Sequence, residues 1–399
     1  MTRWLGNLAV MAFGLILGFL LLEGGVRLAG FRPPSSKADR VLGHRYKANT
    51  AYMHVGEEGR SHGRFNAAGW RDAGHAEAKP PGTTRILILG DSYVSAFQVP
   101  LDSTFHRRLE QRLNDRALPG HRFEVVALGQ DGNGTASEWL TYRDWGARYA
   151  PDVVAVAFVQ NDPADNWMPV ALDKQRPFLV EDGDSLRLDT SFTEDPGFRK
   201  WERGNFLRDH SALWAAASSA AAKLRSRKLP PRMIGGEVQD GYYRAWNFDR
   251  RVLPDTLTPF RITEKIYARF ARDVAADGRR FVAFHVGFAQ QEHQPNRDSL
   301  AAADPNFDEN KSARWLMSVG ERNGFPVVPL SPAFRAASIA ANGRPLWFGN
   351  GSLFGHWNSE GHSVTAEAMA RYFARTLPGL DTTGTAPADV PGLAELEAR

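Results

Sequence analysis

Four polar blocks in this sequence carry side chains that together could catalyse acyl transfer. Ser92 follows the apolar run 85–89, a position that exposes a side chain at the edge of a sheet. Gly132 lies in a glycine-rich stretch, where a backbone N–H ahead of a helix can face an anion. Asn161 follows a third apolar run, and its amide can donate to the same anion. His356 is a candidate general base.

Each of these residues also has a structural interpretation. A serine after a strand often caps a helix, an asparagine often caps a turn, and a lone histidine is usually structural. Their order along the chain separates the two interpretations, because each block follows a strand or a strand–helix unit. Parallel strands place such blocks at one edge of a sheet, where ligands bind.

The alternation of strands and helices predicts an α/β fold. We expect a three-layer α/β/α sandwich around a five-stranded, mainly parallel, flavodoxin-like sheet. The last strand contains prolines and is expected at an edge. The predicted strands are 85–89, 123–128, 153–159, 281–284 and 325–330.

Local signals predict where three helices begin. Asp102 or Ser103 is expected to cap the first helix. The stretch 135–138 has the pattern of a capping box, and Thr258-Pro259 has the pattern of an N-cap followed by proline.

The N-terminal segment Trp4–Leu22 is almost wholly apolar and predicts an uncleaved membrane anchor. A signal peptidase site at Ala29 is disfavoured because Arg27 stands in the way. More cations follow this segment than precede it, which by the positive-inside rule would keep the C-terminal side in the cytoplasm, although long domains can translocate regardless. We predict a single-pass protein with its N-terminus in the cytoplasm and residues 31–399 outside, in the periplasm.

Composition narrows the function classes. The 399 residues include no cysteine, which excludes disulfides, thiolate metal sites and cysteine nucleophiles. A net charge of +4 is ordinary for this length, so no nucleic-acid partner is expected. No dinucleotide or phosphate-loop pattern occurs, and His356 and His362 are not at metal-ligand spacing. We therefore expect neither a cofactor nor a metal.

The blocks Gly90-Asp91-Ser92, Gly132, Asn161-Asp162 and His356 resemble those of the SGNH (GDSL-type) hydrolases. The stretches 65–72 and 356–362 resemble a bacterial, membrane-anchored branch of that family. The resemblance implies Ser92 as nucleophile and His356 as base. It also implies an oxyanion hole made by the N–H groups of Ser92 and Gly132 and the side chain of Asn161. Other residues of these blocks, which the resemblance suggests as supporting, are Asp91, Asp162 and Asn358.

The sequence departs from the family pattern beside the histidine. An aspartate is expected two or three residues before it, where Phe354 and Leu353 stand. A family asparagine ahead of the glycine turn is also replaced, by Ala127. Three possibilities follow for His356. A main-chain carbonyl accepts its Nδ1–H, with the Phe354 ring packed inward; a carboxylate from elsewhere replaces the aspartate; or the site is a non-catalytic relic. The first is favoured, and the carboxylates considered for the second are Asp162, Asp165 and Glu360.

The resemblance also divides the chain. Together with hydropathy and composition, it gives an anchor at 1–30, an irregular lead-in at 31–83, a hydrolase domain at 84–378 with an insertion at about 163–257, and a disordered tail at 379–399. The expected function is a serine-dependent esterase or O-deacylase. With the anchor, the expected substrate is an acylated cell-envelope polysaccharide or a similar ester. The alternatives are an O-acyltransferase with the same site and a non-catalytic carbohydrate-binding pseudoenzyme.

Overall fold

The computed structural model describes residues 2–32, 35–56, 58–183, 185–204, 206–226, 233–234, 237–238, 245–342, 344–348 and 355–381.

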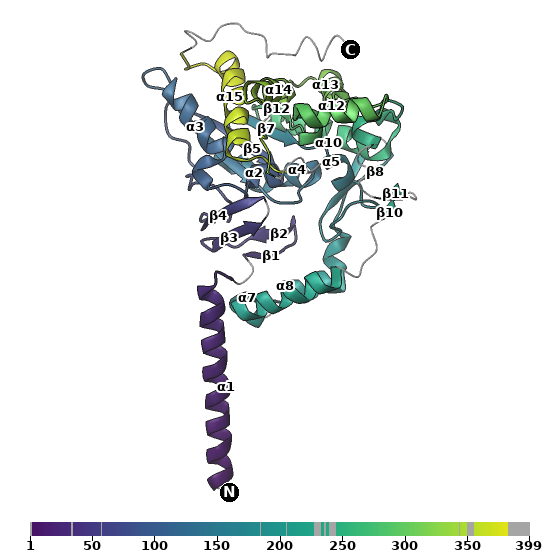
Figure 1. Cartoon of the computed structure of the whole chain (residues 1–399). Helices are drawn as coiled ribbons and strands as arrows, with labels where there is room; N and C mark the ends of the chain where they lie inside the picture. The colour runs from purple at the N-terminus through teal and green to yellow at the C-terminus, as the bar shows by residue number, and fades with distance from the viewer. Residues whose placement is uncertain are drawn as a thin grey trace.

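A parallel sheet of five strands forms the centre of the molecule (Figure 1). Its order is β13-β12-β7-β5-β6, and every neighbouring pair is parallel. The chain adds β6 on one side of β5 and then reverses to build the other side, which confirms the predicted flavodoxin-like order. As its prolines indicated, β13 is an edge strand. The strands are β5 (Thr83–Gly90), β6 (Arg122–Gly129), β7 (Val153–Phe158), β12 (Arg280–His285) and β13 (Val327–Pro329).

Helices cover both faces of this sheet. In β5, Ile86 and Ile88 join one core cluster while Leu87 and Leu89 join the other, because successive side chains of a strand point to opposite faces. The predicted three-layer sandwich is therefore confirmed. The first face packs against α3 (Phe105–Asp115), α14 (Ser331–Ala340) and α15 (Ser359–Thr376), and the second against α4 (Thr135–Asp144), α10 (Thr258–Ala276) and α13 (Lys311–Asn323).

The predicted helix starts are each wrong by one or two residues. The residue before α3 is Thr104, because residues 101–103 form a 3₁₀ turn. The residue before α10 is Leu257. At α4 the capping box does not form: a distant side chain replaces it, since Asn166 Oδ1 accepts from the Ala136 N–H at 3.0 Å. A tertiary contact of this kind leaves no local pattern in the sequence.

The lead-in at 31–83 was expected to be irregular. That prediction is wrong, because the segment carries two antiparallel hairpins. Few of their residues are apolar, and a small aromatic cluster holds them instead: Tyr46 stacks on Phe65 at 4.4 Å, and Tyr52 meets Phe97 edge-on at 5.1 Å. The strands are β1 (Ser36–Asp39), β2 (Gly43–Tyr46), β3 (Ala51–Gly56) and β4 (Gly59–Arg64).

The expected insertion holds short elements outside the sheet. The longest of them that the structure describes is a helix of 15 residues at 212–226. Trp246 is buried, whereas Trp214 is 46% exposed. The elements of this region are α5 (Asp162–Asp165), β8 (Phe178–Asp182), β9 (Ser185–Asp189), α6 (Pro196–Glu202), α7 (Phe206–His210), α8 (Ala212–Ser226), β10 (Met233–Ile234) and β11 (Glu237–Val238). The remaining short helices are α2 (Ser92–Ser95), α11 (Ala289–Glu292) and α12 (Gln294–Ala303).

The N-terminal helix α1 (Thr2–Leu28) projects away from the rest of the molecule (Figure 1). Its stretch Trp4–Leu28 is long and apolar enough to cross a membrane, and none of its most apolar window is buried. At the other end of the chain, Leu380 is buried in the core and bridges to Ala117, so order continues past 379. The rest of the expected tail, 382–399, lies outside the described residues.

A buried arginine joins the lead-in to the sheet domain. Arg71 Nε donates to the Tyr52 hydroxyl at 2.7 Å, and its other nitrogens donate to the carbonyls of Ser95 at 2.8 Å and Val99 at 2.5 Å. Two of its partners lie in the segment that follows Ser92, at the end of α2 and just beyond it. The hairpin layer is thereby fixed to the segment that carries the candidate nucleophile.

We predict that Arg71→Ala lowers the free energy of unfolding by roughly 2–4 kcal/mol, because it leaves buried carbonyls and a hydroxyl without a donor. Thermal unfolding of the purified full chain measures this change. Arg344→Ala is the matched control, since the Arg344 side chain is 72% exposed, and its effect should stay within about 0.5 kcal/mol. Equal melting temperatures for the two variants would show that Arg71 does not hold the layer.

Candidate active site

Ser92 begins α2 directly after β5, on a tight turn. The Asp91 carboxylate accepts from the Tyr93 N–H at 2.9 Å and so caps this short helix. The turn packs closely on the neighbouring strand: a Cβ added to Gly129 would lie 2.4 Å from the Ser95 nitrogen. Glycine at this position lets β6 approach the turn, which holds Ser92 at the carboxyl edge of the sheet.

His356 lies beside Ser92, as the sequence predicts. Its Nε2 is 2.8 Å from Ser92 Oγ, a hydrogen-bond distance. The two residues are 264 positions apart in the sequence. His356 comes from the segment before α15, and the parallel sheet brings this segment and the end of β5 to the same edge.

A glutamate from the lead-in holds the other side of the imidazole. His356 Nδ1 lies 2.6 Å from Glu58 Oε2, and the His356 backbone N–H donates to Glu58 Oε1 at 3.2 Å. An ionised carboxylate only accepts hydrogen bonds, so Nδ1 carries the proton and Nε2 is left to accept from Ser92. Ser92, His356 and Glu58 form one chain of hydrogen bonds.

The expected main-chain carbonyl at Nδ1 is therefore wrong: a carboxylate takes that position. It is also none of the three carboxylates considered from the sequence. Asp165 receives a bond from Asn161, Asp162 accepts from the Val159 N–H at 3.0 Å, and Glu360 lies in the first turn of α15. Phe354 lies outside the described residues.

Glu58 reaches the site from the turn between β3 and β4. Gly59, with φ +106°, lies so close to the Gln98 carbonyl that a Cβ there would be 2.4 Å from its oxygen. The Ser61 hydroxyl donates to the Phe97 carbonyl in the same loop. These contacts hold the hairpin against the segment that follows Ser92. The sequence signal for this residue is weak. The stretch 56–59 is a pair of glutamates between two glycines, which is a common turn pattern and does not indicate that Glu58 contacts His356.

The carboxylate changes the electrostatics of the histidine. Burial alone would lower the pKa of His356, but the hydrogen bond and charge of Glu58 outweigh it and raise that pKa above 6.5. Burial would likewise raise the pKa of Glu58, yet the hydrogen bond to His356 lowers it below 4.5. The pair thus favours an ionised glutamate and stabilises an imidazolium.

Ser92 and His356 open onto a cavity of about 380 Å³ that Gly132 and Asn161 also line. Gly132 has φ +75°, a conformation that favours glycine. Asn161 lies at the start of α5, and its Nδ2 donates to Asp165 Oδ2 at 2.7 Å. All four residues singled out from the sequence therefore meet at one cavity.

Arg176, which no sequence pattern singled out, ties two parts of this cavity together. It is 4% exposed. It donates to the Gly132 carbonyl, and its Nη2 donates to Asp165 Oδ1 at 2.7 Å. Because Asp165 also holds the Asn161 amide, one buried cation positions both segments that would supply oxyanion donors.

The other residues suggested as supporting accept hydrogen bonds from backbone N–H groups and so stabilise turns and helix starts near the site. Asp91 caps α2, and burial raises its pKa to about 7. Asp162 braces the turn after β7, and burial raises its pKa well above 3.8. Asn358 caps α15, since its Oδ1 accepts from the N–H groups of Glu360 and Gly361 at 2.9 and 3.0 Å.

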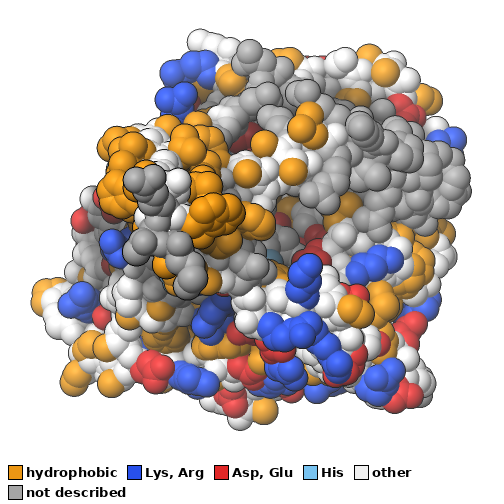
Figure 2. Space-filling view, turned by 90° about the horizontal axis from the view of Figure 1, so that it is seen from below, with side chains coloured by type: hydrophobic (Ala, Val, Ile, Leu, Met, Phe, Trp, Pro, Cys, Tyr) orange, Lys and Arg blue, Asp and Glu red, His pale blue; other side chains and the backbone are white. Residues whose placement is uncertain are grey.

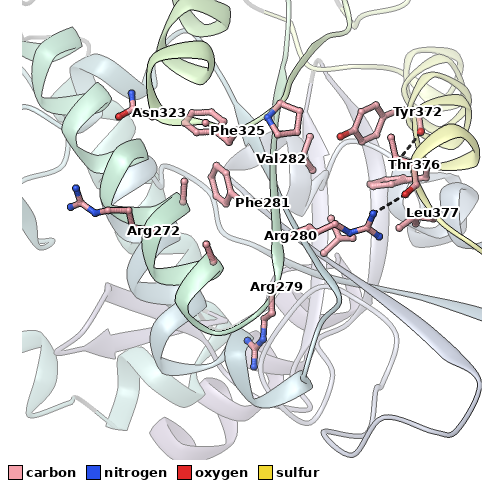
Figure 3. A pocket seen from close by; sticks show the side chains of 16 residues that line it. Arg272, Arg279, Arg280, Phe281, Val282, Asn323, Phe325, Tyr372, Thr376 and Leu377 are labelled. Atoms are coloured by element: carbon pink, nitrogen blue, oxygen red, sulfur yellow. Dashed lines mark hydrogen bonds between the residues drawn. The ribbon is translucent and has the colours of Figure 1, made fainter.

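A second cavity, of about 370 Å³, lies at the opposite end of the sheet (Figure 3). Arg280 donates to the Thr376 carbonyl at 2.7 Å, and Arg279 is bonded to the Tyr142 hydroxyl. Figure 3 shows Arg272 and Arg279 directed away from the ring of Phe281. The described residues that line it include no serine, histidine or carboxylate. Of these two cavities, only the first is lined by a serine and a histidine among the described residues.

No protein-family model matches the chain, and no curated protein is similar to it in sequence. Among solved structures it is similar to LAE5, an α/β hydrolase from the metagenome of Lake Arreo, Spain, at 16% identity and a TM-score of 0.39, over 73% of this chain and 94% of that one. It is also similar to the acetyl xylan esterase AlAXEase (13%, TM-score 0.37, 71% and 97%) and to TesA (11%, TM-score 0.37, 74% and 100%).

We predict that Glu58→Gln lowers the pKa of the His356 imidazole, because the neutral amide removes the charge that stabilises the imidazolium while burial still opposes it. The pKa in the unsubstituted protein should lie above 6.5. NMR titration of the imidazole signals measures both values, with His356→Ala used to assign the signal. Glu360→Gln is the control, because Glu360 is exposed in the first turn of α15, four residues after His356; an equal change in both variants would contradict a specific role of Glu58.

Proposed function

We propose that this protein is a serine-dependent carboxylester hydrolase that forms an acyl-enzyme on Ser92. The observation that carries the proposal is the hydrogen-bond chain from Ser92 through His356 to Glu58, at the edge of a cavity that Gly132 and Asn161 line. The resemblance of the same blocks to SGNH (GDSL-type) hydrolases of a membrane-anchored branch supports it.

In the proposed mechanism, Ser92 Oγ attacks the ester carbonyl carbon while its proton passes to His356 Nε2. The carbonyl oxygen becomes an oxyanion, which the N–H groups of Ser92 and Gly132 and the Asn161 amide stabilise. The intermediate collapses as the imidazolium gives its proton to the leaving alcohol. Water, deprotonated by His356, then attacks the acyl-enzyme, and the imidazolium returns the proton to Ser92 Oγ as the acid is released.

Glu58 has two roles in this scheme. It accepts from Nδ1, which fixes the tautomer that leaves the Nε2 lone pair facing Ser92. It also carries the negative charge that compensates the imidazolium when the proton moves. In a serine protease with an aspartate in this place, replacing the carboxylate by an amide lowers the rate about 10⁴-fold.

Two alternatives concern the same site. An O-acyltransferase would share every step until the second acceptor, where a sugar hydroxyl would replace water. A non-catalytic carbohydrate-binding protein was suggested by the missing aspartate, and the carboxylate of Glu58 in contact with His356 removes that reason. We propose an acylated cell-envelope polysaccharide as the substrate, because an anchored domain acts on molecules near the membrane.

We predict that Ser92→Ala abolishes hydrolysis of a short-chain aryl ester, and that Glu58→Gln lowers kcat/KM by roughly 10²–10⁴-fold. A fluorophosphonate should label the unsubstituted protein but not Ser92→Ala. Glu360→Gln is the control and should keep the original activity. Activity in Ser92→Ala, or a full rate in Glu58→Gln, would overturn the assignment. A protein that the phosphonate does not label would favour the non-catalytic alternative.

We further propose that α1 spans the membrane with the N-terminus in the cytoplasm and residues 31–399 in the periplasm. A cell-envelope substrate requires this orientation. Protease added to intact spheroplasts is expected to digest the domain, whereas a cytoplasmic control protein stays intact. Full protection of the domain until the membrane is lysed would reverse the orientation.

A further inference from the structure

Exposed apolar side chains gather at the end of α1 and along α7 and α8. Single exposed apolar residues are common on protein surfaces, but a group at one junction indicates a surface that something covers. Figure 2, seen from below along α1, shows the hydrophobic side chains of that helix together with others on this side of the molecule, and Lys and Arg side chains nearby. The large ones are Leu28 (91% exposed), Phe31 (50%), Phe206 (76%), Leu207 (44%), Trp214 (46%) and Leu224 (62%).

The start of α8 is fixed to α1 by charged hydrogen bonds. Glu23 Oε1 accepts from the Ala212 N–H at 2.8 Å, and Oε2 accepts from the Leu213 N–H at 3.0 Å. A carboxylate of α1 therefore caps the N-terminus of α8, where negative charge is favoured. Arg27 Nη2 adds a bond to the His210 carbonyl at 2.6 Å. These contacts set the angle between the two helices.

That angle places α8 across the end of α1 rather than along it (Figure 1). If α1 runs through a bilayer, α8 lies near the plane of the bilayer surface. On α8, Trp214, Ala217 and Leu224 are exposed and fall on one side of the helix. Tryptophan and leucine on one face are typical of helices that lie in the membrane interface.

Basic side chains lie beside this apolar face, at the end of α1. Arg27, Arg32 and Lys47 line a cavity of about 570 Å³ at this junction, together with Asp209 and His210. Arg32 Nη1 donates to the carbonyls of Arg27 and Phe31, at 2.7 and 2.9 Å. Basic side chains beside the end of a membrane helix are attracted to lipid phosphates.

We propose that α7 and α8 lie in the headgroup layer of the bilayer and form a second membrane attachment beside α1. The occupant of this apolar face is the lipid surface, since the face continues from the end of the helix that enters it. This inference rests on the proposed membrane-spanning role of α1. It implies that the domain has a fixed orientation on the membrane, with the hairpins β1–β4 toward the lipid and the sheet above them (Figure 1).

The depth of single nitroxide labels tests this proposal. The chain contains no cysteine, so Ala217→Cys and Leu224→Cys each give one labelling position in the full-length protein. The protein is placed in nanodiscs of mixed zwitterionic and anionic phospholipid. Accessibility to oxygen is compared with accessibility to a water-soluble nickel chelate. Leu15→Cys, in the middle of α1, is the lipid-buried reference, and Ile339→Cys, exposed on α14, is the aqueous reference.

We expect the labels at 217 and 224 to show an oxygen-to-nickel ratio several-fold above that at 339 and below that at 15. Labels at 217 and 224 that match 339, while the label at 15 is in lipid, would overturn the second attachment and leave the anchor intact. A label at 15 that is accessible to nickel would overturn the membrane-spanning role of α1 and the inference with it.

Discussion

The bond between Glu58 and His356 is the contact on which the candidate site depends. Without it, the imidazole would have neither a fixed tautomer nor a charge to balance its protonation. The carboxylate comes from 298 residues away, so the chain must hold a small hairpin against the loop after Ser92 with the accuracy of a hydrogen bond. The tight fit of Gly59 against Gln98 and the bonds from Arg71 into the same loop supply that accuracy. The lead-in is thus part of the site.

The sequence predicts those parts of the structure that local chemistry determines. Buried parallel strands such as 153–158 are nearly continuous apolar runs, and Ser92, Gly132 and Asn161 stand where such strands end, so order along the chain suffices to place them. Glu58 could not be found in this way, because one surface carboxylate in a turn looks like any other until its partner is known. The same limit explains the helix start at α4, where Asn166 caps Ala136 from another segment.

Arg176 shows that the insertion also belongs to the site. A buried cation is costly unless it is paired, and here Asp165 and the Gly132 carbonyl accept from the two terminal nitrogens of Arg176. These bonds fix the position of the Gly132 turn relative to the Asn161 amide. Donors to an oxyanion contribute most when they are fixed before the charge develops. A region without regular strand–helix alternation therefore contributes to the geometry of the candidate site.

The hairpin layer connects the two ends of this structure. It carries Glu58 toward the sheet, and its residue Lys47 lies 3.4 Å from Asp209 in α7, beside the end of α1. A shift of the layer by about 1 Å relative to the sheet would stretch the bond from Glu58 to His356 beyond hydrogen-bond length. The site therefore requires that movement of α1 does not displace the hairpins relative to the sheet. Packing alone would favour an apolar side chain among Tyr46, Tyr52 and Phe65, yet Arg71 lies against the Tyr52 ring. A side chain with several donors can tie the layer to the carbonyls of Ser95 and Val99, which an apolar one cannot do.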